Sequence, residues 1–106
     1  MLVVREIMYC KPGKVKPLVE KFLAMNRLAP KIGMPPMKIM TDFSAERFWM
    51  LVAEMEVPDL RTFEEVFAGD APSQDPEVAK EFGEIMQGYH DLVDHGRREI
   101  YRLEGG

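Results

Sequence analysis

Few side chains in this chain could move a proton, and Glu6 and His90 are the strongest candidates. Glu6 interrupts an apolar stretch, Leu2–Cys10, and a carboxylate on an apolar strand surface is costly unless it is paired or hydrated. We predict that it is either a general base or half of an ion pair across the sheet. The candidate cations for that pair are Arg5, Lys38, Arg98 and Arg102. His90 borders the apolar stripe of a helix, where it could line a pocket or simply mark the edge of the buried surface.

Apolar side chains that could contact a ligand form a second set. The chain has nine methionines in 106 residues, and methionine adapts to irregular apolar shapes. Met8, Met40 and Met50 are predicted to share one face of a sheet, the face that the helices leave uncovered. A ligand cavity and a methionine-rich dimer seam would both use such a face. The predicted ligand contacts are Met8, Met40, Phe48, Met50 and Met86.

Other kinds of chemistry lack their sequence signals. There is no glycine-rich phosphate loop, no zinc-type spacing and no nucleophile elbow, so we expect no metal and no cofactor. Cys10 is the single cysteine, and the net charge is −4 with scattered basic residues. We therefore expect a reducing, cytoplasmic location and no nucleic-acid partner. The first ten residues are too short and too charged for a membrane span, so no membrane partner is expected.

The elements that must position these residues follow from the order of the hydrophobic patterns. Alternation predicts strands and a 3.6-residue period predicts helices. The order is βαββαβ in one domain, residues 1–106, which is the ferredoxin-like α+β arrangement with a four-stranded antiparallel sheet. The expected elements are a strand Leu2–Cys10, a helix to about Leu28, strands 37–43 and 47–57, a helical region after Pro58, and a strand Glu99–Leu103.

The second helical region is predicted to be interrupted. Asp59 is a plausible N-cap for a short first helix, and residues 69–76 are loop-forming. Asp75 with Pro76 is then expected to start a longer helix, and Gly96 to end it. The interruption could be a mobile flap, although a plain connector between two helices is the favoured interpretation.

The helices are expected to cover one face of the sheet only. Trp49 is predicted to face the helices, whereas Glu6, Glu54 and Glu56 are predicted to face away from them. A second copy of the chain is the simplest partner for the uncovered face, so we predict a homodimer formed through it.

The segment Tyr9-Cys10-Lys11-Pro12-Gly13-Lys14, followed by Leu18 and Phe22 in the helix, resembles the dimeric α+β barrel superfamily. That group includes antibiotic-biosynthesis-type monooxygenases and NIPSNAP-like proteins. The resemblance implies two ferredoxin-like units packed sheet to sheet. It also implies a pocket between each sheet and its own helices, or at the seam between subunits.

The leading hypothesis is a homodimer that binds a small hydrophobic or aromatic molecule, as a cofactor-independent monooxygenase in which Glu6 or His90 handles the proton. The alternative is a non-catalytic binding or stress-associated protein. Heme-degrading members of the superfamily have an asparagine where this chain has Glu6, so the resemblance makes a heme protein the weakest of the three hypotheses.

Overall fold

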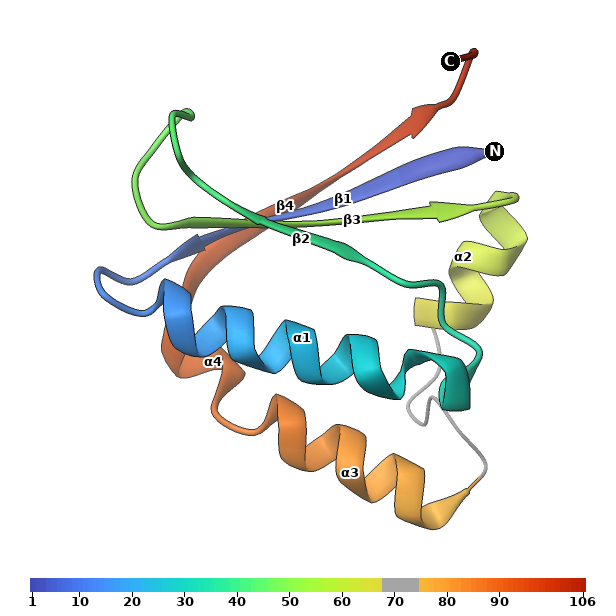
Figure 1. Cartoon of the computed structure of the whole chain (residues 1–106), viewed down its shortest axis with the longest axis horizontal. Helices are drawn as coiled ribbons and strands as arrows, with labels where there is room; N and C mark the ends of the chain where they lie inside the picture. Colours follow the sequence, from blue (N-terminus) through green and yellow to red (C-terminus); the bar gives the residue numbers. More distant parts are fainter. Residues whose placement is uncertain (68–74) are drawn as a thin grey trace.

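The computed structural model describes residues 1–67 and 75–106, and it confirms the predicted α+β order (Figure 1). The sheet is antiparallel with strand order β2-β3-β1-β4, so the two most apolar strands are central, as predicted. Most of the predicted interruption at 69–76 lies outside the described residues. The elements are β1 Leu2–Cys10, α1 Val15–Ile32, β2 Lys38–Thr41, β3 Met50–Val57, α2 Leu60–Phe67, α3 Pro76–Met86, α4 Tyr89–Leu92 and β4 Val93–Arg102.

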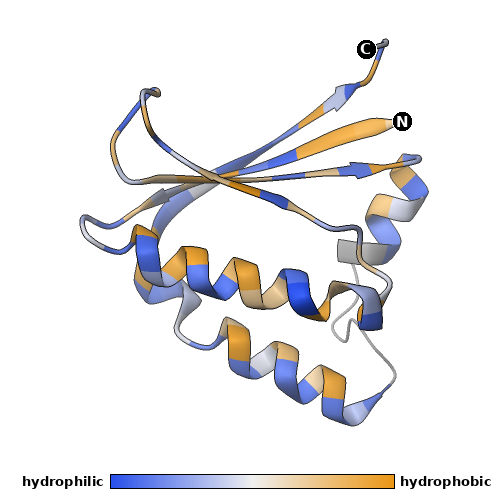
Figure 2. Ribbon diagram, viewed as in Figure 1, coloured by the Kyte–Doolittle hydropathy of each residue, from blue (hydrophilic) through white to orange (hydrophobic). Residues whose placement is uncertain are grey.

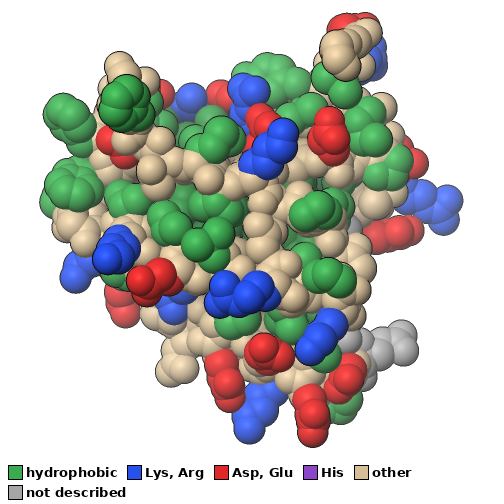
Figure 3. Space-filling model, in the orientation of Figure 1, with side chains coloured by type: hydrophobic (Ala, Val, Ile, Leu, Met, Phe, Trp, Pro, Cys, Tyr) green, Lys and Arg blue, Asp and Glu red, His purple; other side chains and the backbone are tan. Residues whose placement is uncertain are grey.

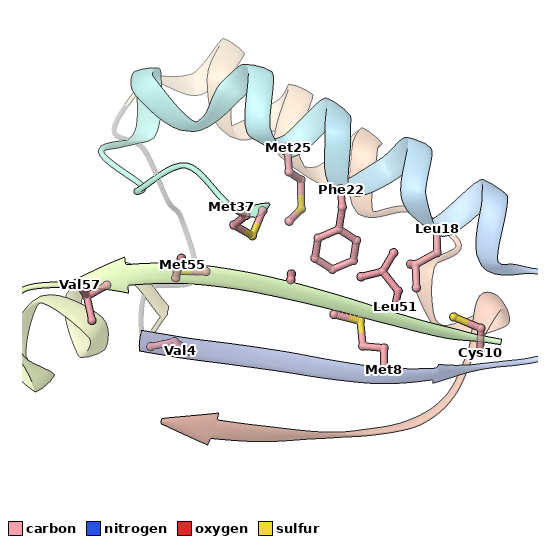
Figure 4. Close-up of a cluster of buried hydrophobic side chains, with 11 residues drawn as sticks. Val4, Met8, Cys10, Leu18, Phe22, Met25, Met37, Leu51, Met55 and Val57 are labelled. Atoms are coloured by element: carbon pink, nitrogen blue, oxygen red, sulfur yellow. The ribbon is translucent and has the colours of Figure 1, made fainter. Parts of the chain in front are cut away.

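The two central strands form the floor of the hydrophobic core. Alternate residues of a strand point to opposite faces, and β1 pairs with β3 in register from Leu2 opposite Val57 to Tyr9 opposite Met50. One set of alternate side chains is buried beneath α1 (Figure 4). This helix-facing set comprises Val4, Met8, Cys10, Leu51, Ala53, Met55 and Val57.

Helix α1 covers that floor with one apolar stripe, visible as the repeated orange segments in Figure 2. Its buried side chains are Leu18, Phe22, Met25, Leu28 and Ala29, which follow helical spacing. The helix extends beyond the predicted end at about Leu28. It continues to Ile32 because Gly33, at φ +69°, supplies the left-handed cap, and the Gly33 N–H donates to the carbonyl of Ala29.

The start of β3 differs from the prediction. Trp49 has φ +63°, so β3 begins at Met50 rather than at residue 47. The Trp49 carbonyl still accepts a hydrogen bond from the Cys10 N–H at 2.8 Å. A left-handed backbone at a bulky residue costs about 1–3 kcal/mol, and it takes Trp49 out of the strand alternation. Trp49 is 44% exposed, so the prediction that it lies in the core is wrong.

The last strand is longer than predicted. Helix α3 ends at Met86, Gly88 (φ +80°) redirects the chain, and β4 begins at Val93 instead of Glu99. Gly96 is therefore a strand residue opposite Met8, and the prediction that it caps a helix is wrong. A Cβ there would lie 2.8 Å from the Ile7 carbonyl oxygen, so this close approach of β4 to β1 requires glycine.

The described helices lie on one face of the sheet, and the β2–β3 connection rises on the other side (Figure 1). We call this other side the open face. Its centre is a small apolar cluster of Ile7, Tyr9, Met50 and Val52, separate from the main core. In the described part of the chain no helix covers the open face (Figure 1), so this sheet surface is available to a partner.

Candidate functional site

Glu6 lies on the helix-facing side of the sheet. It stands opposite Ala53 of β3 and Arg98 of β4, and its carboxylate accepts a hydrogen bond from the Arg98 Nε. The prediction that Glu6 shares the open face with Glu54 is wrong, because the register puts it in line with Val4 and Met8. Its side chain is 17% exposed, so the carboxylate is largely removed from water but paired.

Aromatic and sulfur groups border this ion pair. The Tyr89 hydroxyl donates to the Met8 Sδ at 3.3 Å, and the Arg98 guanidinium lies 5.0 Å from the centre of the Phe63 ring. We call Glu6, Met8, Phe63, Tyr89 and Arg98 the Glu6 cluster. It combines charged groups with apolar neighbours, which is the usual character of a small-molecule site.

Four elements converge to build the Glu6 cluster. β1 supplies Glu6 and Met8 two residues apart, on one face, and β4 supplies Arg98 in register. The sharp turn at Gly88 starts α4, which places Tyr89 against the sheet. Helix α2 contributes Phe63. Each side chain is thus set by a strand register or a helix start, which favours a fixed geometry.

The electrostatics of the Glu6 cluster suit proton transfer. Burial raises the pKa of Tyr89, and the negative charge of Glu6 raises it further. The phenol therefore stays protonated at neutral pH and can donate a hydrogen bond. Glu6 can accept a proton from a bound molecule, and Arg98 can stabilise an anion that forms beside it.

A second set of groups occupies the open face. Arg5 Nε donates to Glu54 Oε1 at 2.8 Å, next to a shallow hollow of about 270 Å³. Met40 and Met50 are on this face, as predicted, whereas Met8 is not. The hollow is lined by Arg5, Ile7, Met40, Val52, Glu54 and Glu99.

Tyr9 ties the β2–β3 connection to the open face. Its hydroxyl donates to Glu46 Oε2 at 3.1 Å and accepts from Arg97. These hydrogen bonds from Tyr9 and Arg97 hold the pKa of Glu46 below its usual value. The Tyr9 ring also stacks on His95 at 4.6 Å and lies 4.7 Å from the Arg47 guanidinium. His95 is thus a strand residue, whereas the predicted helix end at Gly96 would have placed it in the last turn of a helix.

The structure divides the predicted site residues among different surfaces. Glu6, Met8 and Met86 pack on the helix side, and Met40 and Met50 lie on the open face. Phe48 is 84% exposed in the β2–β3 connection. His90 is exposed on α4, and its ring meets the edge of Tyr89 at 5.2 Å.

The predicted ion pair of Glu6 across the sheet is present, and Arg98 is the one of the four candidate cations that forms it. The choice of Arg98 depends on β4 starting at Val93. Two members of the Glu6 cluster were missed from the sequence, Phe63 and Tyr89. Tyr89 fitted the apolar stripe of one long helix, which hid the break at Gly88.

Within residues 1–67 and 75–106, no three His, Cys, Asp or Glu side chains gather in a way that could hold a metal ion. None of the helices in those ranges combines the length and apolar character that crossing a membrane requires.

Solved structures share this fold at low sequence identity. A protein from Agrobacterium tumefaciens aligns with a TM-score of 0.72 and 10% identity over 96% of this chain and 92% of its own. An uncharacterised NIPSNAP domain protein from Burkholderia xenovorans gives 0.70 and 14%, covering 97% and 94%. A candidate antibiotic biosynthesis monooxygenase from Deinococcus radiodurans gives 0.63 and 8%, covering 100% and 95%.

No family model and no curated protein matches the chain. The solved structures include both of the groups named from the opening motif, so the predicted resemblance is confirmed at the level of the fold. The chain has the ferredoxin-like α+β fold that these proteins share.

Proposed function

We propose that this chain acts as a homodimer that binds a small hydrophobic or aromatic molecule and oxidises it with O2 without a cofactor. The observation that carries the proposal is the Glu6 cluster, in which a carboxylate, a guanidinium and a phenol meet beside apolar side chains. The fold shared with the Deinococcus protein is consistent with this activity, but fold analogy alone is a weak argument.

The proposed chemistry begins at an activated methylene group, CH2, held between aromatic or carbonyl groups of the substrate. Glu6 accepts one of its protons, and the resulting carbanion lies next to the Arg98 guanidinium, which stabilises it. The carbanion reduces O2 and bonds to it, and the product is protonated to a hydroperoxide. Loss of the second methylene hydrogen with cleavage of the O–O bond leaves a carbonyl on the substrate and releases the other oxygen atom as water. The substrate therefore supplies all the electrons that the reaction needs.

The extent of the molecular surface supports the homodimer. The accessible area is 7184 Å², against about 6,100 Å² for a self-contained protein of this mass. The excess, about 1,100 Å², is similar to the ~800 Å² that each partner buries in a standard interface. The apolar cluster on the open face is the natural centre of that interface.

A matched pair of variants tests the catalytic role. Oxygen consumption is measured with an anthrone-type substrate for the wild type, Glu6→Gln and Glu54→Gln. Glu54 is the control because it is an equally shielded glutamate paired with an arginine, on the opposite face. We expect Glu6→Gln to lower kcat about 100-fold or more and Glu54→Gln to leave it within twofold. Equal rates for the two variants would reject Glu6 as the base.

His90 is the second proton carrier that the sequence favoured. If His90→Ala lowers kcat while Glu6→Gln does not, the proton goes to the imidazole, which contacts Tyr89. Saturable thermal stabilisation by aromatic compounds without oxygen consumption would instead favour the non-catalytic binding protein. Native mass spectrometry on the same samples reports whether the chain is a dimer.

A further inference from the structure

Three exposed aromatic side chains gather on the β2–β3 connection, residues 42–49, which we call the aromatic arm. Phe43 is fully exposed, Phe48 is 84% exposed and Trp49 is 44% exposed. In Figure 3, hydrophobic side chains gather at the end of the molecule where this connection rises. Exposed apolar groups of this size in one short segment mark an interaction surface.

The aromatic arm is anchored to the sheet at both ends and in its middle. The Met50 N–H donates to Asp42 Oδ1 at 2.8 Å and closes the base of the arm. In the middle, Glu46 accepts from Tyr9 and from Arg97, which lie on β1 and β4. The polar residues of the arm thus face its own sheet, and the phenylalanine rings are left for another molecule.

We infer that the aromatic arm packs against the open face of a second copy of this chain. The inference deepens the proposed homodimer and rests on it. The target is the open-face hollow of about 270 Å³, whose apolar floor is Ile7, Met40 and Val52. An aromatic side chain fits such a hollow, and burying one in an apolar site is a typical anchor of a protein interface.

Charge on the open face favours a second copy over other partners. The chain carries a net charge of −4, yet the open face and the arm above it carry four cations and five anions, so nearly all of their charges can be paired. Such a surface repels its own copy only weakly, and it offers no excess of cations to phosphates or anionic lipids. The cations are Arg5, Lys38, Arg47 and Arg97, and the anions are Asp42, Glu46, Glu54, Glu56 and Glu99.

Two-fold symmetry makes the contact reciprocal. The arm rises at the end of the open face that carries Tyr9 and Met50. A two-fold axis that lies between the two sheets, parallel to them and perpendicular to the strands, brings the open faces together and places that end above the opposite end of the partner, so each arm crosses the partner's sheet toward its hollow. Each copy then contributes one arm and one hollow, as an isologous interface requires.

Photo-crosslinking tests the contact directly. Phe48 is replaced by p-benzoylphenylalanine, and ¹⁴N- and ¹⁵N-labelled protein is mixed before irradiation. We expect cross-links that join peptides of different label and that map to the strand segments containing Met40 or Val52. Cross-links found only within one label, or mapped between copies to the helices, would overturn the inference.

A measurement of dimer dissociation tests the contribution of the arm separately from dimerisation itself. We expect the double variant Phe43→Ser/Phe48→Ser to raise the dimer Kd at least tenfold in sedimentation equilibrium. Leu60→Ser is the control, since Leu60 is also exposed but lies on α2, and its Kd should stay within twofold. Both phenylalanines are exposed, so circular dichroism should show an intact fold.

The remaining outcomes contradict different statements. A wild type that is monomeric at all concentrations rejects the homodimer and the arm together. A wild-type dimer whose Kd is unchanged in the double variant rejects the arm alone. If the wild type sediments with zwitterionic lipid vesicles and the double variant does not, while both dimerise equally, the arm is a membrane contact and the inference is wrong.

Discussion

Consecutive residues of β1, Arg5 and Glu6, point to opposite faces of the sheet, and each forms an ion pair. Glu6 pairs with Arg98 on the helix side, and Arg5 pairs with Glu54 on the open face. The two glutamates are 17% and 21% exposed, and both arginines are 45% exposed. Each arginine also lies about 5 Å from an aromatic ring. By burial and pairing alone the two sites are nearly equivalent.

Their surroundings differ. The Glu6 pair lies among side chains from several helices and strands, where we propose the small-molecule site. The Arg5 pair borders a shallow hollow on a sheet that nothing in the described part of the chain covers. An arginine–glutamate ion pair therefore does not by itself indicate a function. The side chains that surround the pair determine whether it can contact a small molecule or another protein.

The largest expected effect contrasts two neighbours on β3. Leu51 is fully buried on the helix side, and Val52 is half-buried on the open face. We expect Leu51→Ala to lower the free energy of unfolding by about 2–5 kcal/mol, because it leaves a cavity in a packed core. Val52→Ala should cost about 1 kcal/mol or less in dilute protein, because water already reaches that side chain.

Urea denaturation at two protein concentrations measures both. The cost of Val52→Ala should grow with concentration if the open face is a dimer interface, whereas the cost of Leu51→Ala should not depend on it. A Val52→Ala cost as large as that of Leu51→Ala at the lowest concentration would contradict the assignment of an open face.

The fold could be predicted because it depends on patterns that repeat along each element. Strand alternation in β1 and β3 and the stripe in α1 each contain several apolar residues, so one misleading residue does not change the assignment. The boundaries depend on single backbone positions. The left-handed conformation of Trp49 and the interruption of the helix at Gly88 leave no periodic signal in the sequence. The predicted starts of β3 and β4 were therefore wrong.

The site was less predictable than the fold because it depends on how strands pair. Alternation shows that Glu6 shares a face with Met8, and this was predicted correctly. It does not show which face the helices cover, so both were assigned to the wrong side. Arg98 could join Glu6 only through the register of β4 with β1. Contacts between residues 92 positions apart cannot be obtained from local periodicity.

A smaller effect sharpens the comparison of the two ion pairs. Arg98→Ala leaves the Glu6 carboxylate under the helices without its partner, and we expect a loss of about 1–2 kcal/mol. Arg5→Ala leaves Glu54 on the uncovered face, where water can solvate it, and should cost about 0.5 kcal/mol or less. Thermal or urea unfolding of both variants gives the comparison. Equal losses would show that the helices do not shield Glu6 from water.

The smallest expected effect is a local change in acid, at the anchor of the aromatic arm. Hydrogen bonds from Tyr9 and Arg97 lower the pKa of Glu46 in the folded chain relative to its ordinary value of 4.5. A lowered pKa means that the anchor contributes fully above pH 4.5 and is lost as pH falls through the folded-state pKa. Trp49 is the single tryptophan and lies in the arm, so its fluorescence reports the release.

We therefore expect the Trp49 emission to shift below pH 4.5 while far-UV circular dichroism stays constant. Glu46→Gln should already show the acid emission at neutral pH, because an amide cannot pair with the Arg97 charge. Glu65→Gln serves as the control, since Glu65 pairs only loosely with Arg61 on the surface of α2, and it should titrate like the wild type. If the Trp49 emission of Glu46→Gln also shifts in acid, a group other than Glu46 holds the arm against the sheet.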